Sequence, residues 1–214
     1  GTFTGTADRT APGDGAFDGR AYFSGASGDR LETPDYPGVR TDVVSVAAWI
    51  WLDALPSAMF GSAPRVIISK GNGTTEGIFL GVVSGDDLVF RSIDAAFAIH
   101  EAKLTLTAPD VGKWIHIVGV QTLADIYLYK DGVLEDQAPV AGVPAYVTES
   151  LPVVVGEDWE GRIDQPQMWG RELVTSNADG VNEIVEASRQ LAERDAPQPT
   201  FAASGPVPHF DQIG

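Results

Sequence analysis

The amino-acid sequence predicts an all-β fold in which two antiparallel sheets pack face to face as a sandwich. From Phe17 onward, short apolar stretches alternate with turn-forming clusters, and no strand-helix-strand rhythm appears. Asp131 and Gly132 lie between two alternating runs, and both residue types tolerate the positive φ that a tight hairpin turn needs. A chain of 214 residues with 24 Gly and 14 Pro suits one domain made of many short strands.

The expected strands lie between extended termini. Residues 1–15 are predicted to form an arm or a short edge strand, and the sandwich is predicted over residues 16–175. Both alternating faces are apolar over residues 43–54, which predicts a strand in the middle of a sheet that is covered on both sides.

The last expected strand, residues 161–169, contains a proline and a carboxylate. Pro166 predicts an edge strand or a bulge, because proline cannot donate a hydrogen bond to a neighbouring strand. Asp164 shares alternation with Pro166 and Met168, so we expect it to face the core. An ionised carboxylate there needs backbone donors or a cation to offset its desolvation.

Helical spacing is found near the C-terminus. We predict a helix over residues 176–195, capped by Ser176 or Asn177, because apolar residues recur there every three or four positions. Residues 196–214 are rich in Pro, Ala and Gly and cannot fold alone. They are expected to form either a disordered tail or an extended arm that docks elsewhere.

Several short motifs in a fixed order resemble a known family. The sequence reads Gly-Lys-Trp at 112–114, Tyr-Lys-Asp-Gly at 129–132 and Gly-Arg-Ile-Asp at 161–164. This order resembles the laminin-G-like branch of the concanavalin A-like jelly rolls, and the resemblance extends over residues 16–173. Residues 77–92 resemble a hairpin of that family, so a hairpin is expected there. It implies a two-sheet antiparallel jelly-roll sandwich, here with one C-terminal helix and extended terminal arms.

The resemblance also implies a calcium site at the rim of the sandwich. The positions that match the family's metal-binding aspartates are Asp29 and Asp164. Backbone carbonyls would supply the remaining oxygens, since Ca²⁺ takes about six to eight. The alternative is that Asp164 accepts hydrogen bonds from loop amides and no metal binds.

Composition excludes several classes of function. The net charge of −16, from 30 acidic and 14 basic residues, argues against nucleic-acid binding, which draws on clustered Lys and Arg. No apolar run is long enough to span a membrane, and no secretion signal is visible. The absence of Cys excludes disulfides and thiolate chemistry. The acidic excess fits either a halophilic source or an ordinary solubilising surface.

A loop before the last strand suggests a sugar site. Trp159 lies between Asp158 and Glu160, so that an aromatic ring could stack on a sugar while carboxylates bind its hydroxyls. Tyr36 and Tyr146 could extend this platform. The alternative is that Trp159 folds back over the edge of the sheet. Other tryptophans lie within expected strands and are predicted to be core residues: Trp49, Trp114 and Trp169.

Three functions remain open, and the first two are not enzymatic. The first is a virion structural or surface protein, such as a capsid decoration, turret or tail component. It would form a homo-oligomer or bind other virion subunits through its terminal arms, and could attach to cell-surface glycans. The second is a calcium-dependent carbohydrate-binding module of a secreted or cell-surface protein. The third, a glycoside hydrolase, lacks the alternating Glu and Asp of a catalytic strand. The expected location is the virion surface or the extracellular space.

Overall fold

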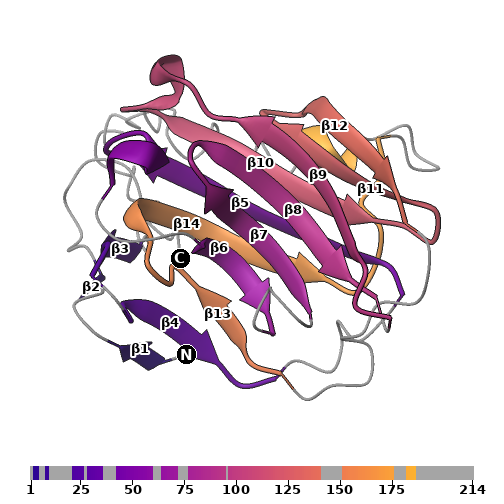
Figure 1. The fold of residues 1–214 in the computed structure, drawn as a ribbon, viewed down its shortest axis with the longest axis horizontal. Helices are drawn as coiled ribbons and strands as arrows, with labels where there is room; N and C mark the ends of the chain where they lie inside the picture. Colours follow the sequence, from indigo (N-terminus) through magenta and orange to yellow (C-terminus); the bar gives the residue numbers. More distant parts are fainter. Residues whose placement is uncertain are drawn as a thin grey trace, which may run out of the picture.

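The computed structural model shows two stacked antiparallel sheets whose strands run in similar directions (Figure 1). It describes residues 2–4, 8–9, 21–26, 28–35, 42–59, 64–71, 77–94, 96–140, 151–175 and 182–186. In spatial order the first sheet contains β1 (Thr2–Thr4), β4 (Arg30–Thr33), β13 (Val153–Val155), β6 (Arg65–Lys70), β7 (Ile78–Ser84), β8 (Asp87–Ile93) and β9 (Ile99–Thr105). The second contains β12 (Val133–Pro139), β11 (Asp125–Lys130), β10 (Trp114–Gln121), β5 (Val44–Leu52), β14 (Glu160–Trp169), β3 (Ala21–Ser24) and β2 (Asp8–Arg9). Two short 3₁₀ segments are η2 (Pro56–Ala58) and η3 (Ala108–Asp110). The jelly-roll prediction is confirmed.

Alternation along the strands places one apolar face of each sheet in a common core. Strand β5 lies between β10 and β14, as its two apolar faces predicted, and buries Ala48 and Ile50 in this core. The sheets approach closely where Phe90 of β8 faces Gly119 of β10. A Cβ atom at Gly119 would lie 2.3 Å from the ring of Phe90, so only glycine leaves room for the phenyl group.

The predicted hairpins are confirmed. Strands β11 and β12 are joined by Asp131 and Gly132, whose φ values of 50° and 82° are those of the tight turn that the Asp-Gly pair predicted. Strands β7 and β8 pair in the same antiparallel way.

The described N-terminal residues are edge strands of the sandwich. Strand β1 pairs with β4 at the edge of the first sheet, and β2 pairs with β3 at the edge of the second. This agrees with the edge-strand alternative for residues 1–15. The remainder of that segment lies outside the described residues.

Part of the C-terminal prediction can be compared with the structure. Residues 183–186 are helical, and the Oδ1 atom of Asn182 accepts a hydrogen bond of 3.0 Å from the backbone N–H of Val185. Ser176, Asn177 and most of the predicted helix lie outside the described residues, as does the whole of 196–214. Among the residues that the structure describes, no helix is long and apolar enough to cross a membrane.

Strand β14 contains a bulge that overturns one prediction. The register of β14 against β5 shifts between Asp164 and Gln167, and Gln165 has a φ of 47°. Ile163 faces the core before the bulge, and Met168 faces the core after it. Asp164 is paired with the outward-facing Trp49, so the expectation that its side chain faces the core is wrong. The bulge at Pro166 was predicted, but β14 is a central strand rather than an edge strand.

A buried ion pair lies between the sheets at the end of β6. Lys70 is fully buried, and its Nζ atom binds the carboxylate of Asp35 and, at 2.9 Å, the backbone oxygen of Leu151. The side chain of Asp35 is 14% exposed. This pair links the ends of β4, β6 and β13, because Thr33, Val153 and Lys70 form one row across these strands.

We expect Lys70→Met to lower the free energy of unfolding by about 3 kcal/mol, because it removes the buried ammonium group that binds the mostly buried carboxylate of Asp35. Lys103→Met is the matched control, since Lys103 is 58% exposed and lies 3.7 Å from Asp87. Its loss should stay below about 1 kcal/mol. Urea unfolding of both variants measures the difference, and equal losses would show that the Lys70 pair does not hold the strand ends.

Candidate functional site

An aromatic and charged cluster lies on the outer face of the second sheet. We call it the Trp51 cluster; it consists of Trp51, Asp53, Trp114 and Arg162. Cross-strand pairing brings it together, because Trp51 of β5 is the register partner of Trp114 on β10 and of Arg162 on β14. Direct cross-strand neighbours share a face of the sheet. Three adjacent strands thus present their side chains at one place.

The geometry of the Trp51 cluster is fixed by several contacts. The rings of Trp51 and Trp114 meet edge to face, with centroids 5.9 Å apart. The guanidinium carbon of Arg162 lies 5.2 Å from the centroid of the Trp51 ring. The Oδ1 atom of Asp53 accepts hydrogen bonds from Nε1 of Trp51 at 3.0 Å and from Nη1 of Arg162 at 3.3 Å. A partly exposed aromatic surface is therefore combined with oriented polar groups.

The neighbouring row on the same face is more deeply buried. It runs from Asp164 through Trp49 to His116, again as direct register partners. The rings of Trp49 and His116 lie 4.9 Å apart. The Asp164 carboxylate accepts a hydrogen bond of 2.8 Å from the backbone N–H of Gln165, which stabilises the positive φ of the bulge. Burial lowers the pKa of His116 from 6.5 to about 4, so its imidazole is neutral at pH 7.

The far end of this outer face is covered by the C-terminal segment of the described chain. Leu173 and Ile184 pack there in a second apolar cluster with Ala47, Val118 and Tyr129. The Trp51 cluster lies at the opposite end of strands β5 and β10. Leu173 and Ile184 therefore leave the Trp51 cluster partly exposed.

The prediction that three tryptophans are core residues is wrong in detail. Trp49, Trp114 and Trp169 are half-buried, and all three point to the outer face of the second sheet. Trp169 packs against the second apolar cluster. The sequence contained the necessary signal: Trp49 and Trp51 alternate with Ala48 and Ile50, so the two sets had to lie on opposite faces.

Trp159 is not a surface platform for sugars. Its side chain is fully buried in the main core, so this prediction is wrong. A tight turn directs it inward, because the backbone N–H of Trp159 donates to the oxygen of Gly156 at 3.1 Å and Asp158 adopts a φ of 56°. Asp158 accepts a hydrogen bond of 3.1 Å from Gly28, and Glu160 is half-buried beside Gly25. Tyr36 and Tyr146 lie outside the described residues.

The predicted calcium ligands lie on different elements: Asp29 directly precedes β4 of the first sheet, and Asp164 lies on β14 of the second. Asp29 is buried, and its Oδ2 atom accepts a hydrogen bond of 2.5 Å from the hydroxyl of Ser24, which pairs with Glu160. Asp164 lies four positions further along β14, which is about 13 Å in a strand. The described ranges contain no group of three or more His, Asp or Glu that could hold a metal. Two aspartates with backbone carbonyls are not such a group, so calcium binding at Asp29 and Asp164 stays a prediction.

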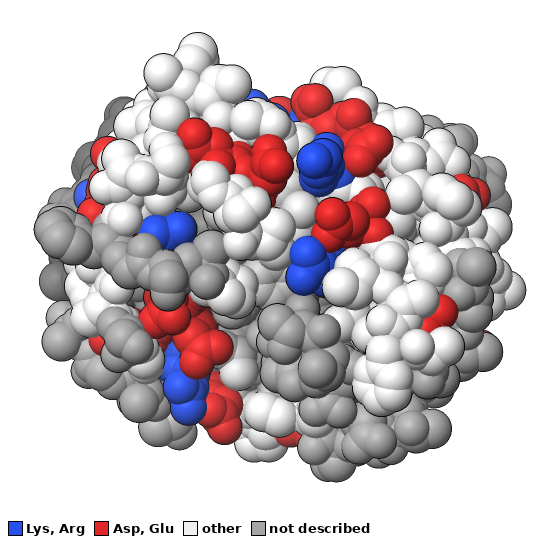
Figure 2. Space-filling view, in the orientation of Figure 1, with Lys and Arg blue, Asp and Glu red and all other residues white. Residues whose placement is uncertain are grey.

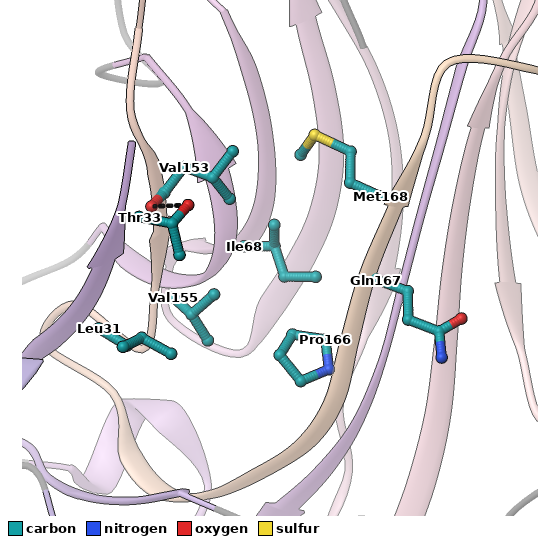
Figure 3. Close-up of a pocket in the computed structure, with 8 residues that line it drawn as sticks. All are labelled: Leu31, Thr33, Ile68, Val153, Val155, Pro166, Gln167 and Met168. Atoms are coloured by element: carbon teal, nitrogen blue, oxygen red, sulfur yellow. Dashed lines mark hydrogen bonds between the residues drawn. The ribbon is translucent and has the colours of Figure 1, made fainter. Parts of the chain in front are cut away.

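A cavity of about 330 Å³ opens between the sheets beneath the bulge of β14 (Figure 3). Figure 3 shows that Pro166 and Met168 point into it, whereas Gln167 points to the other side of the strand. The cavity has few polar groups in its lining. The hydroxyl of Thr33 donates a hydrogen bond of 3.4 Å to the backbone oxygen of Val153. The lining residues are Leu31, Thr33, Ile68, Val153, Val155, Pro166, Gln167 and Met168.

Charged side chains on the face shown in Figure 2 are mostly acidic, and basic groups lie beside acidic ones. Two such pairs join β8 to β9: Arg91 lies 2.8 Å from Glu101, and Lys103 lies 3.7 Å from Asp87. A halophilic origin stays a prediction.

The two stacked antiparallel sheets define a jelly-roll module. A family model described as the concanavalin A-like lectin/glucanases superfamily matches residues 24–177, and the chain belongs to this superfamily. A search of curated proteins finds no match.

Solved structures confirm the same fold. Domain 4 of an extracellular arabinanase from Geobacillus stearothermophilus, solved with arabinotriose, is 15% identical with a TM-score of 0.64, and the alignment covers 86% of this chain and 82% of that domain. The binding domain of botulinum neurotoxin serotype D is 13% identical with a TM-score of 0.66, over 88% of this chain and 46% of that one. The binding domain of Paraclostridial Mosquitocidal Protein 1 is 15% identical with a TM-score of 0.65, over 86% and 45%. The chain thus spans less than half of these toxin domains.

We expect acid to weaken the fold through His116. Its pKa is about 4 in the folded state and 6.5 in the unfolded chain, so between these values the unfolded chain binds a proton that the folded state does not. The stabilisation from neutral His116 is complete above pH 6.5 and falls by about 3 kcal/mol as the pH drops to 4.

Urea unfolding at several pH values measures this effect, and His116→Gln should reduce the loss of stability between pH 6.5 and 4. His100→Gln, which changes a histidine on the first sheet, should leave the contribution of His116 in place. An identical pH dependence in the wild type and His116→Gln would contradict the assignment.

Proposed function

We propose that the chain is a non-catalytic carbohydrate-recognition module that binds its ligand at the Trp51 cluster. The observation that carries this proposal is the edge-to-face pair of Trp51 and Trp114 next to the oriented Arg162 and Asp53. Sugar sites combine an apolar aromatic face, on which the ring of the sugar packs, with a few fixed hydrogen-bonding groups. The cluster has both parts on the rigid central strands of a sheet.

The contacts within the cluster favour recognition of hydroxyl groups. Asp53 is held by the indole N–H of Trp51 and by Arg162, so its second carboxylate oxygen is oriented without further rearrangement. The side chains of Arg162 and Asp53 are 31% and 35% exposed, which leaves both within reach of a ligand. Preorganised groups lose little entropy on binding. An acceptor and a donor beside an aromatic face thus suit a neutral sugar.

The structural neighbours support the same proposal. The arabinanase domain was solved with arabinotriose, and the match covers most of that domain. A binding domain of a botulinum neurotoxin was solved with a sialylated ligand, although this chain covers only 46% of it. Both likenesses favour a binding role and, with the extracellular arabinanase, a location outside the cell.

The carboxylates near the cluster have structural partners rather than catalytic ones. Asp53 binds Trp51 and Arg162, and Asp164 binds the backbone of its own bulge. Hydrolysis of a glycosidic bond uses two carboxyl groups that face each other across the bond. These partners favour binding without turnover.

A virion role stays a separate prediction. It depended on terminal arms that reach neighbouring subunits, and residues 10–15 and 196–214 lie outside the described part of the chain. The described N-terminal strands β1 and β2 pair within their own sheets. A glycan-binding module could also serve on a virion surface, so the two functions are compatible.

We expect Trp114→Ala to weaken binding of a neutral oligosaccharide by about tenfold, because an aromatic contact contributes about 1 to 1.5 kcal/mol. Ligands are first identified on a glycan array that includes arabinotriose, and affinity is then measured by calorimetry. Phe97→Ala is the matched control, since Phe97 is an aromatic residue that is 71% exposed on the turn between β8 and β9. It should bind like the wild type.

Circular dichroism shows whether the Trp114→Ala variant is folded. This control is needed because Trp114 is half-buried and contributes to packing. A folded Trp114→Ala variant with unchanged affinity would contradict the proposed site. Array binding that is lost in Phe97→Ala instead would move the site to the other sheet.

A further inference from the structure

We propose that the cavity beneath the β14 bulge is a binding site for an uncharged aliphatic molecule. This site is separate from the Trp51 cluster and does not depend on the proposed function. The two sites lie on opposite faces of the same strand: Arg162 points outward, whereas Pro166 and Met168 point into the cavity. Its volume of about 330 Å³ falls within the usual range of small-molecule sites, about 300 to 1,000 Å³.

The bulge and small side chains create this space. The shift in register turns Pro166 toward the first sheet, so that its ring lines the cavity although the residue is solvent-exposed. Val153 and Val155 form the opposite wall on β13. Elsewhere in the sandwich, large side chains such as Phe23, Phe90 and Trp159 fill the core.

The lining determines the chemical class of the ligand. Six of the eight lining residues are aliphatic, proline or methionine. The hydroxyl of Thr33 lies near the backbone oxygens of Pro34 and Val153, and Figure 3 shows the side chain of Gln167 pointing away. A sugar would lose most of its hydrogen bonds on entering such a site, which disfavours it.

The charges near the cavity disfavour an anionic ligand. The nearest row of the first sheet contains Lys70 next to Val153, but the ammonium group already binds Asp35 and the backbone oxygen of Leu151. A carboxylate ligand would have to compete with Asp35. Met168 can adapt its unbranched side chain to different ligand shapes. An aliphatic alcohol or the acyl chain of an uncharged lipid therefore fits best.

The test uses the uncharged dye Nile red as the probe and decanol as the competitor. The wild-type chain should bind the dye saturably at one site, with increased fluorescence, and decanol should displace it. Arabinotriose should not displace it, because the Trp51 cluster is elsewhere. Displacement by arabinotriose would overturn the assignment of two separate sites.

Two variants fill the cavity from opposite walls. Val153→Phe and Met168→Phe should each weaken binding of the dye by at least about tenfold, which corresponds to about 1.4 kcal/mol. Leu134→Phe is the control, because Leu134 is 47% exposed on the edge strand β12. It should bind the dye like the wild type.

Thermal unfolding shows whether each variant is folded, and Met168→Phe carries the test if Val153→Phe does not fold. The proposal is overturned if the wild type shows no saturable binding, or if a folded cavity variant binds the dye as tightly as the wild type. Dye binding that is lost when the chain forms dimers at higher concentration would show that a second copy of the chain covers the cavity. That result would also overturn the proposal.

Discussion

The bulge in β14 is the constraint that creates the apolar cavity between the sheets. A strand without it would alternate regularly, so that Asp164, Pro166 and Met168 would share a face. The positive φ of Gln165 interrupts this alternation, and the carboxylate of Asp164 stabilises it by accepting the backbone N–H of Gln165. Arg162 and Asp164 lie on the outer face before the bulge, whereas Pro166 and Met168 point to the inner face after it. One local irregularity thus separates a polar surface from an apolar cavity.

Burial explains why polar groups on the outer face are arranged in two rows with different properties. His116 lies deep in its row, where desolvation holds it neutral, and the backbone N–H of this residue donates to the carboxylate of Asp131 at 2.8 Å. In the next row, Arg162 and Asp53 remain about one third exposed and keep their charges in contact with water. Polar groups that are half-exposed and already fixed can replace bound water by a ligand with little loss of conformational entropy. Fully buried polar groups stabilise the sheet instead.

Much of the fold could be predicted from local patterns, because those patterns report backbone geometry. Asp131 and Gly132 fixed a hairpin, and the two apolar faces of residues 43–54 indicated a central strand. The position of Trp159 could not be inferred in this way. Acidic neighbours suggest an exposed side chain, but the turn from Gly156 to Trp159 rotates the indole into the core, and that rotation depends on backbone dihedrals that composition does not encode.

The Trp51 cluster could not be predicted from the sequence for a related reason. Trp51, Trp114 and Arg162 are far apart in the sequence, and they meet through the register of β5 with β10 and β14. Register is a tertiary property that a single sequence shows only indirectly. Motif searches favour residues that are close along the chain, such as Asp158, Trp159 and Glu160. A binding surface built across strands is assembled from positions at different places in the sequence, so the identity of the central strands had to be known before the aromatic residues on their outer face could be grouped.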